Sequence, residues 1–124
     1  MKVFNAINSN WDSKVNFVDE NNVVLGYDLS QCCCESADWF INDTPVNHII
    51  EQTDQNPNLD NYRFDIDYFR KETGGDFDGG GIAIFRITDG INEKFIHIYN
   101  SHNGYYSHGF TFDMGDKKLQ EDSL

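Results

Sequence analysis

The side chains best suited to chemistry lie in two short segments, which we call the cysteine motif and the tyrosine motif. The cysteine motif is Cys32-Cys33-Cys34-Glu35-Ser36, and the tyrosine motif is His102-Asn103-Gly104-Tyr105-Tyr106-Ser107-His108. Thiolates are nucleophiles and metal ligands, imidazoles exchange protons near neutral pH, and a tyrosine joins an apolar ring to a polar tip. Adjacent cysteines cannot all point to one face of a strand or helix, so regular structure does not explain them. We therefore expect the function to depend on these two motifs.

The cysteines and histidines offer ligands that zinc prefers, and they are Cys32, Cys33, Cys34, His97, His102 and His108. Their spacing argues against a structural zinc site, because adjacent sulfurs diverge and the sequence has no Cys-x-x-Cys pair. We expect buried, reduced cysteines that pack as small apolar side chains beside hydrogen-bonded histidines, with no metal and no other cofactor. A catalytic metal site with one cysteine and two histidines remains an alternative.

A cysteine nucleophile is another alternative, since a histidine can ionise a nearby thiol while Glu35 or Asp38 orients that histidine. The net charge of -12 works against it, because surrounding negative charge disfavours the thiolate. The sequence shows no coherent catalytic set, so no catalytic residue is predicted.

Carboxylates in the middle of the chain favour binding over acid–base chemistry. Asp65 and Asp67 would share one face of a strand, where paired carboxylates can bind a cation or share a proton. Asp76 and Asp78 lie in a glycine-rich run that faintly resembles a calcium loop, but the glutamate that completes such a loop is missing. With Asp60 nearby, these side chains suit the docking of a basic protein.

The composition favours a single acidic domain over residues 1–124, with ends at 1–12 and 113–124 that are open to fraying. The chain has 21 acidic and 9 basic residues, so it would repel a nucleic-acid backbone or an anionic membrane and attract a basic protein. It has no apolar run as long as a signal peptide or a membrane span requires, and its consecutive cysteines fit reduced thiols. We expect a cytoplasmic protein.

Apolar runs and turn signals predict the elements of the first half of the chain. The runs 14–19 and 23–28 flank a turn sequence, Glu20-Asn21-Asn22, and predict a hairpin. Thr44-Pro45 begins a predicted short helix that extends to about residue 53. The alternation over 62–68 favours a half-buried strand, although a helical turn also fits its apolar residues.

In the second half, the glycine-rich run 74–81 predicts a flexible or sharply turning connection. The runs 82–88, 94–99 and 105–112 predict three sequential antiparallel strands, followed by a frayed or helical charged tail at 113–124. The sum is an α+β fold with an antiparallel sheet of about five strands covered by one or two helices. The predicted core residues are Ile82, Ile84, Phe85, Ile87, Phe95, Ile96, Ile98, Phe110 and Phe112, closed by Trp39 and Phe40.

The two motifs together carry a resemblance. Cys33-Cys34-Glu35-Ser36, followed by Ser101-His102-Asn103-Gly104-Tyr105-Tyr106-Ser107, resembles a small group of uncharacterised bacterial and phage proteins with a Cys-Cys-Glu motif and a Ser-Asn-Gly-Tyr-Tyr-Ser motif in the same order. The resemblance spans residues 23–112. The chain departs from the pattern at His102, which separates Ser101 from Asn103, and at Cys32, where an aspartate is common. The group has no activity to carry over, so the resemblance implies a shared fold and a shared pair of motifs, and makes a composite site more plausible.

The sequence predicts a small acidic inhibitor that binds a basic protein, most concretely an immunity protein that neutralises a basic, nuclease-type bacterial toxin. The expected partner-binding residues are acids and motif side chains, namely Asp60, Asp65, Asp67, Asp76, Asp78, His102, Tyr105, Tyr106 and His108. Motif residues without a defined role are Cys33, Cys34, Glu35, Asn103 and Gly104. The alternatives are an enzyme or a metal- or ligand-binding module built on Cys32–Glu35 and His102–His108, a phage anti-defence protein, and a purely structural role for both motifs.

Overall fold

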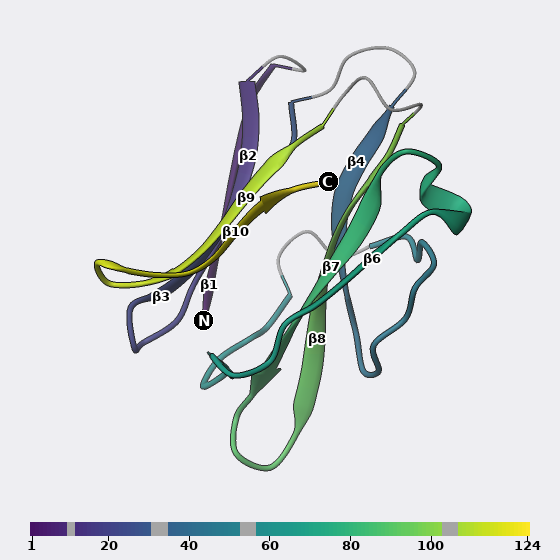
Figure 1. The fold of residues 1–124 in the computed structure, drawn as a ribbon. Coiled ribbons are helices and arrows are strands. Elements are labelled where there is room, and N and C mark those ends of the chain that lie inside the picture. The colour runs from purple at the N-terminus through teal and green to yellow at the C-terminus, as the bar shows by residue number, and fades with distance from the viewer. Residues whose placement is uncertain (10–11, 31–34, 53–56, 103–106) are drawn as a thin grey trace.

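The computed structural model describes residues 1–9, 12–30, 35–52, 57–102 and 107–124. These residues form ten β-strands and one 3-10 helix of three residues. The strands make two five-stranded antiparallel sheets that face each other as a sandwich (Figure 1). No helix in the described part of the chain is long and apolar enough to cross a membrane.

The first sheet, sheet A, has the strand order β1-β2-β3-β9-β10. Its strands are β1 (Lys2–Ser9), β2 (Asp12–Val18), β3 (Val23–Asp28), β9 (Gly109–Met114) and β10 (Lys117–Ser123). The predicted hairpin is confirmed, because β2 and β3 pair from Lys14 opposite Asp28 to Val18 opposite Val24. Strand β3 also pairs with β9, which brings distant parts of the sequence side by side.

The second sheet, sheet B, has the order β4-β8-β7-β5, and β6 also pairs with β7. Its strands are β4 (Ser36–Asn42), β5 (Arg63–Phe64), β6 (Arg70–Thr73), β7 (Gly81–Thr88) and β8 (Glu93–Ser101). The strands predicted at 82–88 and 94–99 are confirmed as β7 and β8, which pair along their length. The 3-10 helix η1 (Gly75–Phe77) follows β6.

Inward-pointing side chains of both sheets form the main core. In β3 burial alternates along the strand, so that Val23, Leu25 and Tyr27 are buried. Across the sandwich, Phe17 of sheet A meets Trp39 of sheet B edge to face, with ring centroids 5.2 Å apart. Each predicted core residue is buried, as are the two that were expected to close the core: Ile82, Ile84, Phe85, Ile87, Phe95, Ile96, Ile98, Phe110, Phe112, Trp39 and Phe40.

The outer faces of the two sheets differ. Sheet B carries a second apolar cluster on its outer face, and its buried members are Phe40, Phe77, Ile82, Ile84, Phe95 and Tyr99. Val46 and Ile50 of the segment 43–52 pack against this cluster and cover it. The outer face of sheet A instead presents small or polar residues such as Asn16, Gly26 and Thr111.

The expected α+β class is wrong, since the described residues are nearly all in antiparallel strands. The helix predicted at 44–53 is also wrong, because its described part, 44–52, is irregular. Val46 N donates to His97 Nε2 at 3.1 Å, and Ile41 N donates to Gln52 Oε1 at 2.8 Å. Hydrogen bonds to sheet B thus replace those of a helix. Val46 and Ile50 bury their side chains as the pattern predicted, but on irregular backbone.

The strand predicted at 62–68 is correct only for Arg63 and Phe64, which form β5. Beyond them the chain turns, because Asp65 Oδ1 accepts a hydrogen bond from Asp67 N at 3.0 Å and Asp65 O accepts one from Tyr68 N at 3.2 Å. Such an aspartate turn competes with extended pairing.

The three strands predicted between 82 and 112 do not form one sheet. Strand β9 pairs with β3 and β10 instead of β8, so the chain crosses from sheet B to sheet A after β8. Part of the predicted third strand, residues 105 and 106, lies outside the described residues. The pattern of apolar residues identifies a strand but not the sheet to which it belongs.

The tail at 113–124 is not frayed or helical, because most of it forms β10. Strand β10 pairs with β9 from Lys117 opposite Met114 to Ser123 opposite Gly109. Beyond it, the backbones of Leu124 and His108 exchange two hydrogen bonds of 2.8 Å. The charges of β10 suit an edge strand, where they discourage pairing with another chain. At the other terminus, residues 2–9 form β1.

Candidate functional site

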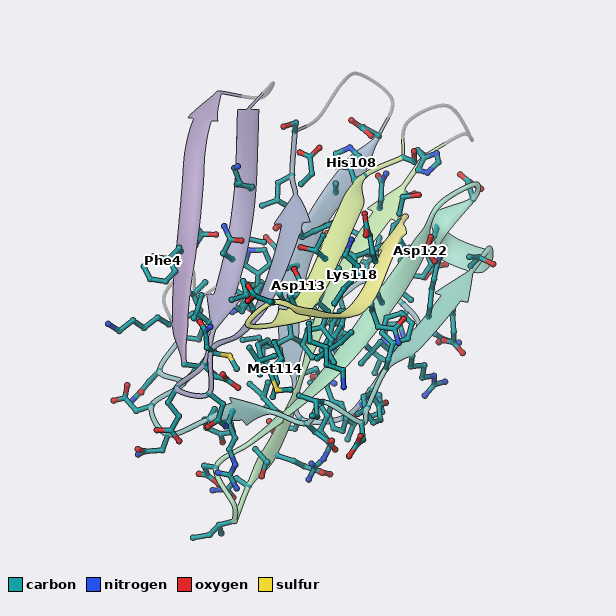
Figure 2. All side chains as sticks on the ribbon, turned by 60° about the vertical axis from the view of Figure 1, so that its left-hand side comes forward. Phe4, His108, Asp113, Met114, Lys118 and Asp122 are labelled. Carbon is teal, nitrogen blue, oxygen red and sulfur yellow. The ribbon has the colours of Figure 1, made fainter. Side chains whose placement is uncertain are left out.

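The described parts of the two motifs lie at the same end of the sandwich, which we call the motif end. Ser36 at the start of β4 is paired with Ser101 at the end of β8. In sheet A the same end holds the last residue of β3 and the first of β9. The opposite end, the turn end, holds the β2–β3, β7–β8 and β9–β10 turns. In Figure 2, His108 lies near the motif end of β9 and Met114 near its turn end.

A buried pair of side chains joins the two motifs. His108 Nε2 lies 2.9 Å from Glu35 Oε2, and the two side chains are only 4% and 1% exposed. On its other side, His108 Nδ1 lies 2.6 Å from the carbonyl oxygen of Asp28. Glu35 precedes β4 of sheet B and His108 precedes β9 of sheet A, so the pair connects the sheets. It also brings the motifs together, as a composite site requires.

Both ring nitrogens of His108 are occupied. The Asp28 carbonyl can only accept, so Nδ1 carries a hydrogen and donates it, and one further proton lies between Nε2 and the Glu35 carboxyl group. A general base or a metal ligand needs a ring nitrogen that faces the substrate or the metal. Because His108 offers neither nitrogen, we interpret the Glu35–His108 pair as a clamp between the sheets and not as a catalytic dyad.

Two more buried hydrogen bonds close the motif end. Tyr27 Oη of sheet A donates to the carbonyl oxygen of Tyr99 in sheet B at 2.7 Å. Asn100 Nδ2 of sheet B donates to the backbone oxygen of Leu124 at 3.1 Å. Burial, and to a lesser extent the nearby carboxylates, raise the pKa of Tyr27 well above its usual value. The phenol therefore stays neutral and keeps its hydrogen bond.

The glycine-rich loop packs against the tyrosine motif. Asp78 and His102 form an isolated bridge, and Gly79 N donates to His102 O at 2.8 Å. A Cβ at Gly80 would lie 1.9 Å from Asn100 O, so only glycine permits this close approach. Of the two predicted alternatives, a flexible and a sharply turning connection, the structure has the turning one, and it holds its aspartates in solvent beside the buried ring of His102.

His97 is a structural residue on the covered face of sheet B. Its ring is fully buried and stacks on Phe40 with centroids 4.3 Å apart. Nδ1 lies 3.1 Å from Phe95 O, while Nε2 accepts from Val46 N, so both nitrogens are used. Burial lowers the pKa of His97 to about 4, which keeps the ring neutral at pH 7. This is the hydrogen-bonded histidine that the sequence favoured over a metal ligand.

The acids that the sequence assigned to partner binding do not form one patch. Asp60, Asp65 and Asp67 lie toward the turn end, where β5 pairs with the last residues of β7. Asp65 is neutralised by an ion pair with Arg86 at 3.2 Å. The aspartates of the glycine-rich loop lie beyond the other end of β7, about 25 Å away at the usual rise of a strand.

Basic residues are concentrated at the turn end. Those in the turn half of the sandwich are Lys2, Arg63, Arg86, Lys94, Lys117 and Lys118. The motif half holds Lys14, Arg70 and Lys71. Arg70 pairs with Glu72 at 3.0 Å, and Lys71 pairs with Asp122 at 2.8 Å. These two ion pairs leave little positive charge to balance other carboxylates at the motif end.

Four exposed carboxylates at the motif end have no ion-pair partner among the described residues. They are Asp28, Asp38, Asp76 and Asp78, which we call the acidic end group. The sequence identified the two aspartates of the glycine-rich loop but not Asp28, and it considered Asp38 only as an orienting group. The signal that could have identified them is their position at strand ends. Asp28 is the last residue of an apolar strand, and Asp38 lies near the start of another.

Several predicted site residues lie outside the described part of the chain, so their roles stay predictions: Cys32, Cys33, Cys34, Asn103, Gly104, Tyr105 and Tyr106. Within the described part, no group of three or more His, Cys, Asp or Glu side chains is arranged to hold a metal ion. The family resemblance also stays a prediction. No protein-family model matches the chain, and neither curated proteins nor solved structures gave a match.

Proposed function

We propose that the protein binds and inhibits a basic protein in the cytoplasm, and that the motif end forms the centre of the binding surface. The observation that carries the proposal is the acidic end group, whose four carboxylates lack ion-pair partners in the described part of the chain. Charged groups left unpaired on a surface create a field that a partner of opposite charge can neutralise.

The placement of the charges supports binding more than general solubility. A carboxylate that serves only solubility can lie anywhere on the surface, and a nearby cation does no harm. Here most basic residues lie in the turn half, so the carboxylates of the motif half have fewer cations near them. Such an asymmetry orients an approaching basic partner toward the motif end and raises the rate of association.

The geometry of the histidines argues for binding over catalysis. His108 and His97 each use both ring nitrogens in hydrogen bonds within the protein, and both are buried. His102 is buried as well, at 5% exposure. A general base must reach the proton that it removes, and the ring nitrogens of His97 and His108 are already used within the protein.

The most concrete form of the proposal is an immunity protein that neutralises a basic nuclease toxin. A nuclease binds phosphate groups with lysine and arginine side chains, and carboxylates on an inhibitor can occupy the same side chains. Tyr105 and Tyr106, which the sequence suggests as aromatic anchors, would add apolar contact and slow dissociation. A phage protein that inhibits a basic defence enzyme would use the same surface.

The proposal is tested by capture and inhibition. Tagged protein is used to capture partners from its host, and the complex is measured by native mass spectrometry, which also reports bound metal. We expect a one-to-one complex with a protein of high isoelectric point, whose nuclease activity falls to the background level at one equivalent of inhibitor. A captured partner that is acidic, or a basic partner whose activity is unchanged in the complex, would contradict the proposal.

A further inference from the structure

A groove crosses the outer face of sheet A next to the motif end. Its volume is about 520 Å³, and it runs between residues of β2 and β10 with β3 and β9 beneath it. Two glycines in its lining, Gly26 of β3 and Gly109 of β9, lower the surface because they lack side chains. Asp28 and Ser30 line its motif end, so the groove is continuous with the acidic end group. A volume of this size can hold a large side chain or a small molecule.

Two oxygen atoms converge above Gly26. A Cβ built on this glycine would lie 2.9 Å from Asn16 Oδ1 and 3.4 Å from Thr111 Oγ1. Asn16 and Thr111 flank Gly26 on the neighbouring strands, in register with it. An amide oxygen and a hydroxyl oxygen near one point suit a group that donates several hydrogen bonds from one plane.

The charged lining of the groove is mainly acidic. It contains the carboxylates Asp28, Glu121 and Asp122 and one ammonium group, Lys14. Glu121 and Asp122 already pair with Lys118 and Lys71, respectively. Asp28 accepts a hydrogen bond from Ser30 N at one oxygen only, and it makes no ion pair in the described part of the chain. The groove therefore favours a cationic group over an anionic one.

We propose that this groove receives an arginine side chain of the basic partner, an inference that rests on the proposed function. A guanidinium group is planar, always charged, and has five N–H donors and no acceptor. The carboxylate of Asp28 and the oxygens of Asn16 and Thr111 supply acceptors at the motif side and the floor of the groove. A lysine ammonium has fewer donors and no planar fork, so it matches this arrangement less well.

An exposed aromatic ring lies beside the groove. Phe4 of β1 is paired with Asn16 of β2, so their side chains lie on the same face of sheet A. Phe4 is 52% exposed, so its ring is open to a partner on this face (Figure 2). Arginine stacks on aromatic rings, so Phe4 offers a second contact for the same partner segment.

Gly109 allows the groove to be filled without disturbing the fold. A Cβ at this position meets no atom within 4 Å, and its backbone is not in the left-handed region. We expect Gly109→Ser, Gly109→Val and Gly109→Leu to keep or slightly raise the melting temperature, because glycine is unfavourable within a strand. Partner affinity should fall with side-chain size, by at least about tenfold for Gly109→Leu, which corresponds to 1.4 kcal/mol.

The chemical identity of the ligand is tested separately by nuclear magnetic resonance with small probes. N-acetyl-argininamide should give saturable shifts in the amides of Gly26, Gly109 and Thr111, and Gly109→Leu should abolish them. N-acetyl-citrullinamide has nearly the same shape without the charge, and it should give no saturable shift. Maltotriose, a neutral polar molecule, is the third probe. Equal shifts from the two amino-acid probes, or saturation by maltotriose alone, would overturn the arginine assignment and indicate a neutral polar ligand.

The groove and the proposed function can fail independently. If the Gly109 series leaves partner affinity unchanged while mutation of the acidic end group weakens it, the groove proposal is wrong and the proposed function stands. If the arginine probe saturates the groove but the partner captured from the host is not basic, the proposed function is wrong and the groove is a cation-binding site of another kind.

Discussion

The two ends of the sandwich are closed in different ways. At the turn end, short turns join strands that are adjacent in the sequence, and Arg86 pairs with Asp65 and Glu93 while Lys94 pairs with Asp43. Other exposed acids there, such as Asp60 and Asp67, make no ion pair in the described part of the chain. At the motif end, the β3–β4 and β8–β9 connections cross between the sheets, and the acidic end group has no ion-pair partner in the described part of the chain. Unpaired carboxylates therefore occur at both ends, but those of the motif end have fewer basic residues near them, because six of the nine basic residues lie in the turn half.

Each end also holds a buried carboxylate that ties the sheets together. Asp19 accepts hydrogen bonds of 2.9 Å from two backbone N–H groups of the β2–β3 turn and from Phe64 N of sheet B. Glu35 instead contacts the side chain of His108. Backbone N–H donors are present whatever the side chains are, so the need to satisfy them is enough to explain why an aspartate occupies position 19. The Glu35–His108 clamp instead requires two specific side chains, a glutamate in the cysteine motif and a histidine in the tyrosine motif.

The largest effect is expected at the turn end. Asp19→Ala removes the acceptor of three backbone N–H groups, two of them in buried bonds, and should cost about 4 kcal/mol. For a domain of this size, the melting temperature should fall by roughly 15 °C. Asp60→Ala, at an exposed position of the same end, is the matched control and should change it by less than about 2 °C. Equal effects would show that Asp19 does not tie the sheets together.

A smaller loss is expected at the motif end. Glu35→Ala breaks the buried pair with His108 and should cost about 3 kcal/mol, because the imidazole loses its partner. Glu35→Gln keeps one hydrogen bond to the ring and should cost about half as much. Thermal unfolding of both variants and of the double variant with His108→Ala measures the coupling. Additive losses would show that the two side chains do not act as a pair.

The fold was predictable from the sequence where the signals are local. The hairpin over 14–28, the pair β7 and β8, and the core residues followed from apolar alternation and turn residues. The segment 44–52 was not predictable, because it is held to sheet B by hydrogen bonds that Val46 N donates to His97 and that Ile41 N of β4 donates to Gln52, which no helix signal describes. Sheet membership also required distant contacts, which a local pattern does not contain.

The candidate site was predictable in part. The two motifs stood out by residue type, and the contact between Glu35 and His108 shows that they approach each other. The sequence did not reveal that this contact occupies the histidine, since that depends on the Asp28 carbonyl at the end of a strand. The sequence predicted five aspartates as partner-binding residues, of which Asp60 and Asp67 lie at the turn end and Asp76 and Asp78 at the motif end. The sequence did not reveal this separation, because it depends on which end of β7 each neighbouring segment pairs with.

The covered face of sheet B should make stability depend on pH. The folded-state pKa of His97 is about 4 and the unfolded value is about 6.5, so the unfolded chain binds more protons between these values. This contribution is therefore present above pH 6.5 and is lost as the pH falls toward 4, with about 2 kcal/mol lost between pH 7 and pH 5. Urea unfolding at both pH values measures it. His97→Gln should reduce the pH dependence, and an unchanged dependence would contradict this role.

The smallest effect is expected for an exposed ion pair of the turn end. Lys94 and Asp43 lie 3.0 Å apart, but the aspartate side chain is 82% exposed. Lys94→Ala should therefore change the free energy of unfolding by less than about 0.5 kcal/mol, and added salt should reduce even that difference. A loss above about 1 kcal/mol would mean that surface pairing at the turn end contributes to stability and not only to charge balance.

The most direct test of the account compares charge reversal at the two ends. Asp38→Lys with Asp76→Lys changes the motif end, and Asp60→Lys with Asp67→Lys makes the same change in net charge at the turn end. All four side chains are exposed, so both variants should keep the wild-type melting temperature to within a few degrees. Calorimetric titration with the captured partner should show at least about 100-fold weaker binding for the motif-end variant and less than about fivefold for the turn-end variant. Equal losses would mean that only the net charge matters, which would contradict the claim that the motif end is the binding surface.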